Sequence, residues 1–511
     1  MNSLRQSKAF RFAKNVSWNL LAQVAIMAIS FFTVPYLVHH MGTESYGLYL
    51  LLQAVTGYLL ILIFGAGSAT VRFVSEFAAA GDGRSLKAAV RYSLGIHLAG
   101  VVVGAVILFG GVNFFVERFF EIPGTLREAG VWVLRCAAVA SVFGALIGFA
   151  SAILQGIQRF DYQNLVVFLQ GSLMPIGTAI LLGLGLGLIG AASWYVVLNA
   201  AVCGVALWLT WTQISPRLSD SVESGKIGLR RFGVYGLSLW VGLLAWNITF
   251  QLDKLFIGTK LSLSELTLYA VPAGILQRLN VVPASVSSVL FPMMSELQGM
   301  SARENLVRMY LKSLRVLLWM ILPVLILLFA LMPQFLTLWL GAEFGGRSVW
   351  PARLLVIAQM FLLLNHVPNM VSASQDRPWY LSGLSWAQAT ISLVAWWSLI
   401  PHYQILGVAA GSLLAQMLPG PIYLHFVHKR LMDLSWERYL SEGLYAPCVS
   451  GALLLAVIFP LHAWADNWFR LGALVSLGVP LYYGSTWFLL GTEDRNLLRS
   501  FLELLRQPRR T

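Results

Sequence analysis

The sequence predicts an all-α integral membrane protein with about fourteen transmembrane helices. Three observations support this fold class. Hydrophobic residues make up 58% and charged residues 11% of the 511-residue chain, whereas about 25% of residues are charged in an average soluble protein. Long apolar segments recur from one end of the chain to the other. The lysines and arginines gather in alternate connections between these segments. No connection is long enough to suggest a separate soluble domain.

Each apolar segment has about 20 residues or more, which is the length that crosses a bilayer as a helix. The first segment is too long for a cleavable signal and lacks a small-residue cleavage site, so we expect it to stay as an anchor. The expected helices cover residues 16–38, 46–70, 88–111, 129–154, 163–184, 187–211, 232–258, 266–294, 312–332, 348–371, 379–400, 404–427, 440–463 and 468–490.

The placement of basic residues predicts the orientation of the chain in the membrane. Most of the 35 lysines and arginines fall on one side, which also holds the N-terminal segment and the tail from Arg495 to Arg510. Because cytoplasmic connections carry an excess of Lys and Arg, both termini are expected in the cytoplasm. The net charge of +13 is therefore interpreted as an orientation signal and an attraction to anionic membrane lipids, and no nucleic-acid partner is expected.

An internal repeat is indicated by a constant offset of 220 residues between related positions. Six expected helices separate the two copies, so the copies would be parallel to one another. This predicts an N-terminal six-helix lobe at 1–212, a second six-helix lobe at 213–428, and two further helices with a basic cytoplasmic tail at 429–511. The matching positions include Tyr49 and Tyr269, Ser75-Glu76 and Ser295-Glu296, Leu86 and Leu306, Ser93-Leu94 and Ser313-Leu314, Gln155 and Gln375, and Gly187 and Gly407.

Two arginines, Arg278 and Arg135, are expected mid-span, where an ionised side chain costs several kcal/mol unless it faces water or a partner. Arg278 would lie about 18 Å along its helix, near the middle of the bilayer. Its planar guanidinium suits the phosphate or pyrophosphate of a substrate, although a structural ion pair would also explain it. Arg135 would lie about 9 Å below the outer end of its helix, where it either binds substrate or snorkels to the surface.

A polar face precedes the end of the expected helix 232–258. Asp253 and Lys254 lie roughly 6–8 Å from that end, and Asn247 and Gln251 extend the face at i, i+4 spacing. This arrangement favours substrate contacts through Lys254, Asn247 and Gln251, with Asp253 as a group that couples transport to an ion. A local interfacial pair is the alternative. Arg72, at the end of the second helix, either borders the cytoplasmic mouth as a substrate contact or follows the charge bias.

Catalytic and metal-binding patterns are absent from the sequence. There is no GxxxxGK[ST] motif, which argues against ATP-driven transport, and the histidines show no metal-ligand spacing with carboxylates or cysteines. Cys136, Cys203 and Cys448 fall inside apolar segments, where packing is the expected role. We therefore predict neither an enzyme nor a cofactor or metal site.

Several motifs together resemble one family of transporters. The first helix begins KNVSWNLLAQ and leads into VPYLVHHMGTESYGLYLL, followed by FGAGSATVRFVSEF; later come LDKLFIG, LTLYAVPAGI and FPMMSEL. This order resembles the polysaccharide-exporting flippases of the multidrug/oligosaccharidyl-lipid/polysaccharide superfamily, over roughly the first 300 residues. The resembling pattern is a proline late in the first helix, G-x-x-x-Y-G-x-Y, an acidic residue late in the seventh helix, and a proline shortly before Ser-Glu.

The resemblance implies two lobes around a cationic cavity, and a polyprenyl-pyrophosphate-linked oligosaccharide carried across a bacterial inner membrane by alternating access. It implies coupling to H+ or Na+, surrounding membrane lipids, and a polysaccharide polymerase as a candidate partner. Arg278 falls on the helix where relatives carry an important arginine. The first helix has no arginine between Lys14 and His39, which favours an O-antigen or exopolysaccharide repeat unit over lipid II. The alternatives are a cation-coupled multidrug antiporter of the same superfamily and, more distantly, a membrane polysaccharide polymerase or ligase.

Overall fold

The structure is a computed structural model. It describes residues 2–120, 122–218, 228–284, 286–287, 290, 294–295, 303–375 and 377–489, with side chains from residue 22 onward except at Pro378. Helices account for nearly all of the described residues, and none of these residues lies in an extended strand. The expected all-α architecture is confirmed. Glu296 and the basic tail from Arg495 lie outside the described residues.

The chain forms two compact units, each made of two segments of the chain. Unit 1 comprises Met1–Val271 and Gln388–Val408, and unit 2 comprises Pro272–Ala387 and Ala409–Thr511. The predicted lobe boundaries at 212/213 and 428/429 stay a prediction, because packing groups need not coincide with repeat copies.

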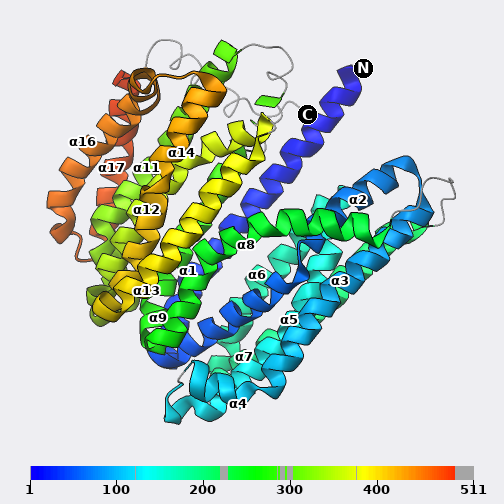
Figure 1. Cartoon of the computed structure of the whole chain (residues 1–511). Helices are drawn as coiled ribbons and strands as arrows, with labels where there is room; N and C mark the ends of the chain where they lie inside the picture. Colours follow the sequence, from blue (N-terminus) through cyan, green and yellow to red (C-terminus); the bar gives the residue numbers. More distant parts are fainter. Residues whose placement is uncertain are drawn as a thin grey trace. The chain divides into compact units, whose positions relative to one another are not determined.

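The helices (Figure 1) are α1 Asn2–Leu59, α2 Ala66–Ala80, α3 Gly83–Gly110, α4 Val112–Phe114, α5 Arg127–Gly156, α6 Phe160–Gly183, α7 Gly187–Ile214, α8 Leu229–Lys260, α9 Leu263–Arg278, α11 Arg303–Leu340, α12 Ala342–Ser374, α13 Pro378–Met417, α14 Pro419–Val427, α15 Trp436–Arg438, α16 Tyr445–Leu461 and α17 Trp468–Leu489.

Ten helical segments among the described residues are long and apolar enough to cross a membrane. The two longest are Ala22–Ile63 with 42 residues and Trp379–Met432 with 54, each about twice the length of a single crossing or more. Each contains a residue with left-handed backbone: Gly42 has φ 75° and Gln404 has φ 51°. A residue in this region interrupts a right-handed helix, so each long segment is kinked there.

The glycine and tyrosine motif late in α1 is explained by close packing inside unit 1. Gly42 supplies the left-handed turn, a conformation that glycine adopts without steric cost. Gly47 lies against α9, where a Cβ atom would stand 2.0 Å from the carbonyl oxygen of Leu263. Thr267 donates a hydrogen bond to the carbonyl of Thr43 over 2.7 Å. The motif therefore seats the second half of α1 directly on the backbone of α9.

The expected helix 266–294 is interrupted, and this corrects the sequence prediction. α9 ends at Arg278, a turn follows at Leu279 and Asn280, and helical residues resume at Val281. Pro283 accounts for the break, because proline lacks the N–H that would bond to the carbonyl four residues earlier and its ring clashes with that carbonyl. The Leu279 carbonyl instead accepts the N–H of Val282 over 3.2 Å. Arg278 is consequently at a helix end.

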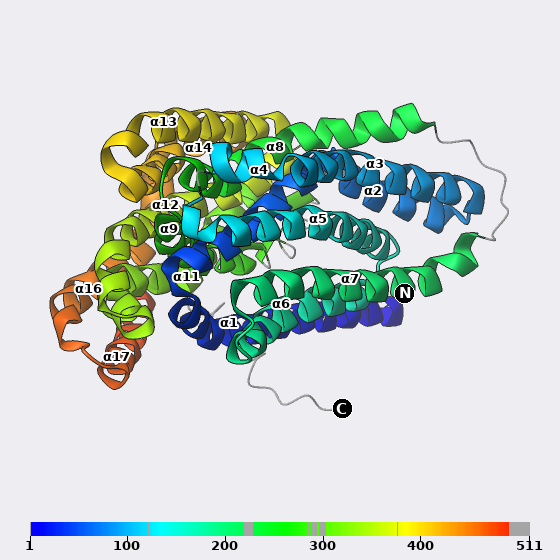
Figure 2. The same ribbon diagram turned by 90° about the horizontal axis from the view of Figure 1, so that it is seen from below.

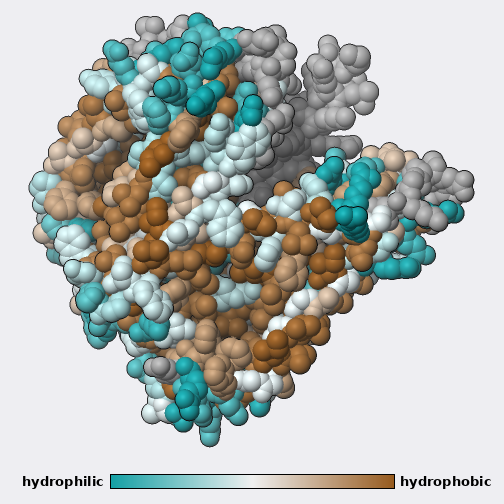
Figure 3. Space-filling model, in the orientation of Figure 1, coloured by the Kyte–Doolittle hydropathy of each residue, from teal (hydrophilic) through white to brown (hydrophobic). Residues whose placement is uncertain are grey.

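Apolar side chains fill each unit. In unit 1, Phe73, Phe232 and Phe149 belong to one buried cluster that joins α2, α3, α5 and α8, and α6 and α7 lie side by side (Figure 2). In unit 2, α11 packs against α12, α16 and α17. Hydrophobic residues also cover broad stretches of the helices' outer surface, with hydrophilic ones gathered near helix ends (Figure 3). This surface is suited to a lipid environment.

Candidate functional site

Asp253 is a buried carboxylate held by two hydrogen-bond donors in unit 1. Its side chain is on α8 and the residue is only 4% exposed. The Tyr269 hydroxyl of α9 lies 2.9 Å from Oδ2, and the backbone N–H of Lys254 donates to Oδ1 over 2.8 Å. An ionised carboxylate accepts both hydrogen bonds, and a protonated one keeps acceptor capacity on its two oxygens, so these contacts accommodate either form of Asp253.

Lys254 turns away from its neighbouring carboxylate and toward the preceding turn of α8. Its Nζ donates to Oε1 of Gln251 over 3.0 Å, and in the described part of the chain no ion pair joins Lys254 to Asp253. The hydroxyl of Tyr58 on α1 donates to the backbone carbonyl of Gln251. Asn247 is half-buried and donates to the carbonyl of Leu243 over 2.8 Å. The expected polar face is therefore a connected group at Gln251–Lys254, with Asn247 one turn before it.

Tyr269 and Tyr58 are the members of this network that sequence reasoning missed as partners of α8. A signal for Tyr269 was present. α8 and α9 form an antiparallel pair joined at Leu261 and Ser262, so residues equally far from that turn come to the same depth. Asp253, eight residues before Leu261, and Tyr269, seven residues after Ser262, are nearly such a pair. Tyr58 contacts α8 from a distant part of the chain, and no local pattern would have identified it.

Arg72 lies on an aromatic cluster between α2 and α8 in unit 1. Its guanidinium is 4.2 Å from the ring centre of Tyr235 and 5.4 Å from that of Phe73. One turn further, Arg231 of α8 pairs with Glu76 of α2 over 3.7 Å. The side chain of Arg72 is exposed. These contacts give it a role in the packing of α2 on α8, whatever else it binds.

Arg135 occupies an exposed face of α5. Its guanidinium lies 5.4 Å from the ring centre of Phe109 on α3, and Trp132, one turn earlier, is also exposed. A cation over an aromatic face is stabilised by about 0.5–1 kcal/mol at exposed sites. Arg135 therefore lies among aromatic side chains of α3 and α5.

Arg278 belongs to unit 2, where it is exposed at the end of α9. The segment that follows it is tied to α12 by polar contacts. Gln359 donates to Oδ1 of Asn280 over 2.6 Å, and Nε2 of His366 lies 3.0 Å from the carbonyl oxygen of Pro283. The Ser287 hydroxyl lies 2.5 Å from the same His366 nitrogen. The helix break next to Arg278 is thus held in place by α12.

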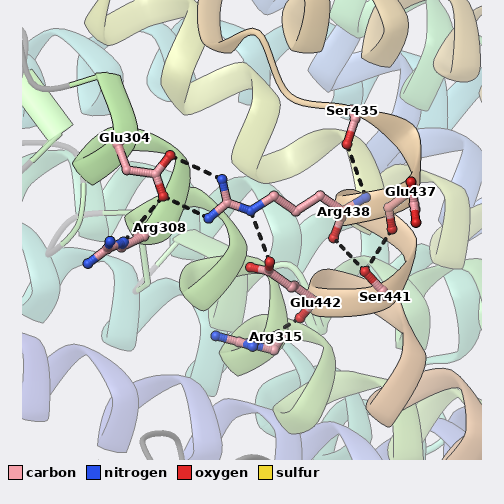
Figure 4. Close-up of polar contacts among 8 residues, drawn as sticks. All are labelled: Glu304, Arg308, Arg315, Ser435, Glu437, Arg438, Ser441 and Glu442. Atoms are coloured by element: carbon pink, nitrogen blue, oxygen red, sulfur yellow. Dashed lines mark hydrogen bonds and ion pairs between the residues drawn. The ribbon is translucent and has the colours of Figure 1, made fainter.

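A group of exposed ion pairs joins the start of α11 to the segment before α16 (Figure 4). Arg438 donates two hydrogen bonds to Glu304, over 2.8 and 3.1 Å, and a third to Glu442 over 2.9 Å. Arg308 reaches Glu304 over 3.3 Å, and Arg315 donates to the backbone carbonyl of Glu442 over 3.0 Å. A planar guanidinium matches a carboxylate in this two-bond geometry. These contacts orient the short α15 segment within unit 2.

Solved structures of membrane transporters share this fold. The chain superimposes on a lipid II flippase MurJ in an inward closed conformation with a TM-score of 0.67, at 14% identity, covering 93% of this chain and 100% of that one. It also matches an inward-facing multidrug-resistance MATE transporter with a TM-score of 0.65, at 16% identity, covering 80% of this chain and 98% of that one. The protein has the fold of transporters of the multidrug/oligosaccharidyl-lipid/polysaccharide superfamily.

The sequence comparisons define the family. Residues 12–298 match the model of the polysaccharide biosynthesis protein family, and the chain belongs to this family, so the resemblance found in the sequence is confirmed. A putative O-antigen transporter of Shigella flexneri is 20% identical over 429 residues, which are 82% of this chain and 98% of that one. A probable flippase, AglR, of Haloferax volcanii is 23% identical over 443 residues, which are 85% of each chain.

Proposed function

We propose that this protein is a flippase that moves a polyprenyl-pyrophosphate-linked oligosaccharide from the cytoplasmic to the outer leaflet of a bacterial inner membrane. The family match, which includes all of α8 and α9, is the observation that carries this proposal. The transporter fold and the relatives named as O-antigen transporter and flippase support it. The product would serve the synthesis of a cell-surface polysaccharide, with a polysaccharide polymerase as a partner that consumes it.

The proposed topology has fourteen crossings, two parallel six-helix copies, and both termini in the cytoplasm. The repeat gains support from side-chain packing within each unit. Arg135 lies over Phe109 at 5.4 Å, and Arg353 lies over Phe329 at 5.3 Å. Phe329 follows Phe109 by the same offset of 220 that relates the other repeat positions. An arginine on the next long helix therefore covers the corresponding phenylalanine in each copy.

The proposed roles divide between charge recognition and coupling. Arg278 and Arg135 would bind the pyrophosphate, assisted by Lys254, because guanidinium and ammonium groups pair with phosphate oxygens. Asn247, Gln251 and Arg72 would contact the sugars or the path that they take; these polar groups lie on α8 and α2.

Asp253 is the proposed coupling group, exchanging H+ or Na+ as the transporter alternates. Binding of an ion to the Asp253 carboxylate would alter its hydrogen bond to Tyr269, which lies on α9. Since α9 leads directly to Arg278, binding of an ion at Asp253 would bias the helix that carries the substrate arginine.

The test uses a strain depleted of this protein and a glycan label that cannot cross the membrane. The proposal predicts that lipid-linked oligosaccharide accumulates in the cytoplasmic leaflet, and that the intact protein restores it to the outer leaflet whereas Arg278→Ala does not. If Arg278→Ala also restores the oligosaccharide to the outer leaflet, the flippase proposal stands. Arg278 would then have a structural role and would not bind the pyrophosphate. An unchanged leaflet distribution, in a strain with no second flippase, would overturn the proposal in favour of the multidrug antiporter.

A further inference from the structure

Arg353 of α12 is a buried arginine surrounded by aromatic rings in unit 2. The residue is 7% exposed. Its guanidinium lies 5.3 Å from the ring centres of both Phe329 on α11 and Trp350 on α12, and 5.5 Å from that of Phe459 on α16. Nε donates to the backbone carbonyl of Phe329 over 3.1 Å. Three helices thus each contribute one aromatic ring that packs against this guanidinium.

The charge of Arg353 is not neutralised by the protein in the part of the chain that the structure describes. No carboxylate there forms an ion pair with it, and the bond from Nε to Phe329 uses one of five N–H donors. A buried cation costs free energy unless it is paired. Rings of aromatic side chains compensate a part of this cost, but no acceptor among the described residues bonds to the four donors of the two terminal nitrogens.

Arg135 in unit 1, which lies two positions out of the repeat register from Arg353, provides a contrast. Arg135 also covers a phenylalanine, but it is exposed. The difference lies in α16, which follows the second copy in the chain and adds Phe459 as a further wall at Arg353. Trp350 and Phe459 remain 63% and 40% exposed. The site around Arg353 is therefore enclosed but borders the outer surface of unit 2.

The sequence prediction places the site near one edge of the membrane, beyond which α11 continues as helix to Leu340 and α12 begins at Ala342. Phe329 and Arg353 lie roughly 5–8 Å inside the predicted ends of their spans at 332 and 348, at the level where tryptophans such as Trp350 mark the membrane interface. An arginine at this depth can extend its head group toward the phosphates of the bilayer. The planar guanidinium offers paired donors that match two phosphate oxygens.

We propose that Arg353, with Phe329, Trp350 and Phe459, forms a binding site for the phosphate head group of a membrane lipid, on the outer side of unit 2. The phosphate accepts from the terminal nitrogens, and the rings exclude water from the pair. The site is built from residues other than the proposed substrate arginines and does not depend on the flippase proposal. α16 has a specific role in this site, because its Phe459 covers one side of Arg353. Arg135 has no such cover and stays exposed.

The experiment measures retention of lipid on the purified full-length protein by native mass spectrometry. The probes are phosphatidic acid, diacylglycerol with the same acyl chains, and inorganic phosphate. Arg353→Gln removes the charge, and Arg353→Lys keeps the charge but loses the planar donors. Arg470→Gln is the matched control, because Arg470 also stacks on a tryptophan, Trp464 at 5.4 Å, but is already paired with Asp466 over 2.6 Å.

The intact protein and Arg470→Gln should retain phosphatidic acid and not diacylglycerol, and Arg353→Gln should lose about ten-fold in retention. Arg353→Lys should fall between the two, which provides a second test if Arg353→Gln does not fold. Equal retention of phosphatidic acid by Arg353→Gln, or of diacylglycerol by the intact protein, would overturn the site. If inorganic phosphate saturates the Arg353 site at the same concentration, free phosphate and not a lipid head group is the ligand. That result would overturn the lipid proposal.

Discussion

Replacing Gly47 with alanine is expected to prevent stable accumulation of the protein in the membrane. The new Cβ atom would lie 2.0 Å from the carbonyl oxygen and 2.7 Å from the carbonyl carbon of Leu263. Both atoms belong to the backbone of a helix, so no side-chain rotation can relieve the overlap. Overpacking of a well-packed contact costs about 3 kcal/mol or more. The loss would also separate Thr43 from Thr267, whose hydrogen bond lies beside the same contact.

Gly57→Ala on the same helix provides the matched control, because nothing lies within 4 Å of a Cβ atom built there. That substitution should be neutral or stabilise the protein by up to about 1 kcal/mol, the usual difference between alanine and glycine within a helix. The amount of folded protein in the membrane and its thermal unfolding temperature in detergent measure both variants. Equal behaviour of the two would contradict the close packing of α1 on α9.

Asp253→Asn is expected to abolish acceleration of transport by an ion gradient while leaving the fold intact. The amide has the size of the carboxylate, and its oxygen can still accept from Tyr269 or from the N–H of Lys254. It cannot bind a proton or balance the charge of Na+. If Asp253 is the coupling group, the gradient-dependent part of the rate should fall at least about ten-fold. The rate in vesicles with and without a gradient measures the effect.

Two further variants separate coupling from general damage. Asp161→Asn removes an exposed carboxylate that pairs with Arg159 over 2.8 Å, and it should leave the gradient response unchanged. Tyr269→Phe keeps the carboxylate but removes its hydroxyl partner, so it should weaken the response less than Asp253→Asn. A normal gradient response in Asp253→Asn would exclude Asp253 as the coupling group and leave it a structural anchor for α9.

Much of the helical architecture was predictable because each segment must satisfy its backbone hydrogen bonds internally when it lies in lipid. Composition and apolar length then identify helices well. The break after Arg278 was less obvious. Pro283 was visible in the sequence, but prolines occur in many membrane helices that merely bend. Whether such a helix kinks or stops depends on its neighbours, here α12, whose Gln359 and His366 hold the segment after the break.

The site was predictable where it is local in sequence. Asn247, Gln251, Asp253 and Lys254 share a stretch of α8, and their polar character contrasts with the apolar residues around them. The direction of each side chain was not predictable. Lys254 bonds to Gln251, whereas the carboxylate of Asp253 accepts from the backbone N–H of Lys254 and from Tyr269 of α9. Contacts between distant parts of the chain, such as Tyr58 on Gln251, are set by packing that no local pattern records.

The most direct measurement of the central claim uses the purified protein in lipid vesicles. A fluorescent polyprenyl-pyrophosphate-linked oligosaccharide is placed in one leaflet, and the fraction that becomes accessible to a membrane-impermeant quencher in the other leaflet is followed over time. Empty vesicles and vesicles with the Arg278→Ala variant are the controls. The account predicts rapid transfer with the intact protein, and slow transfer in both controls. Transfer no faster than in empty vesicles, with a folded protein and gradients of both H+ and Na+ present, would contradict it.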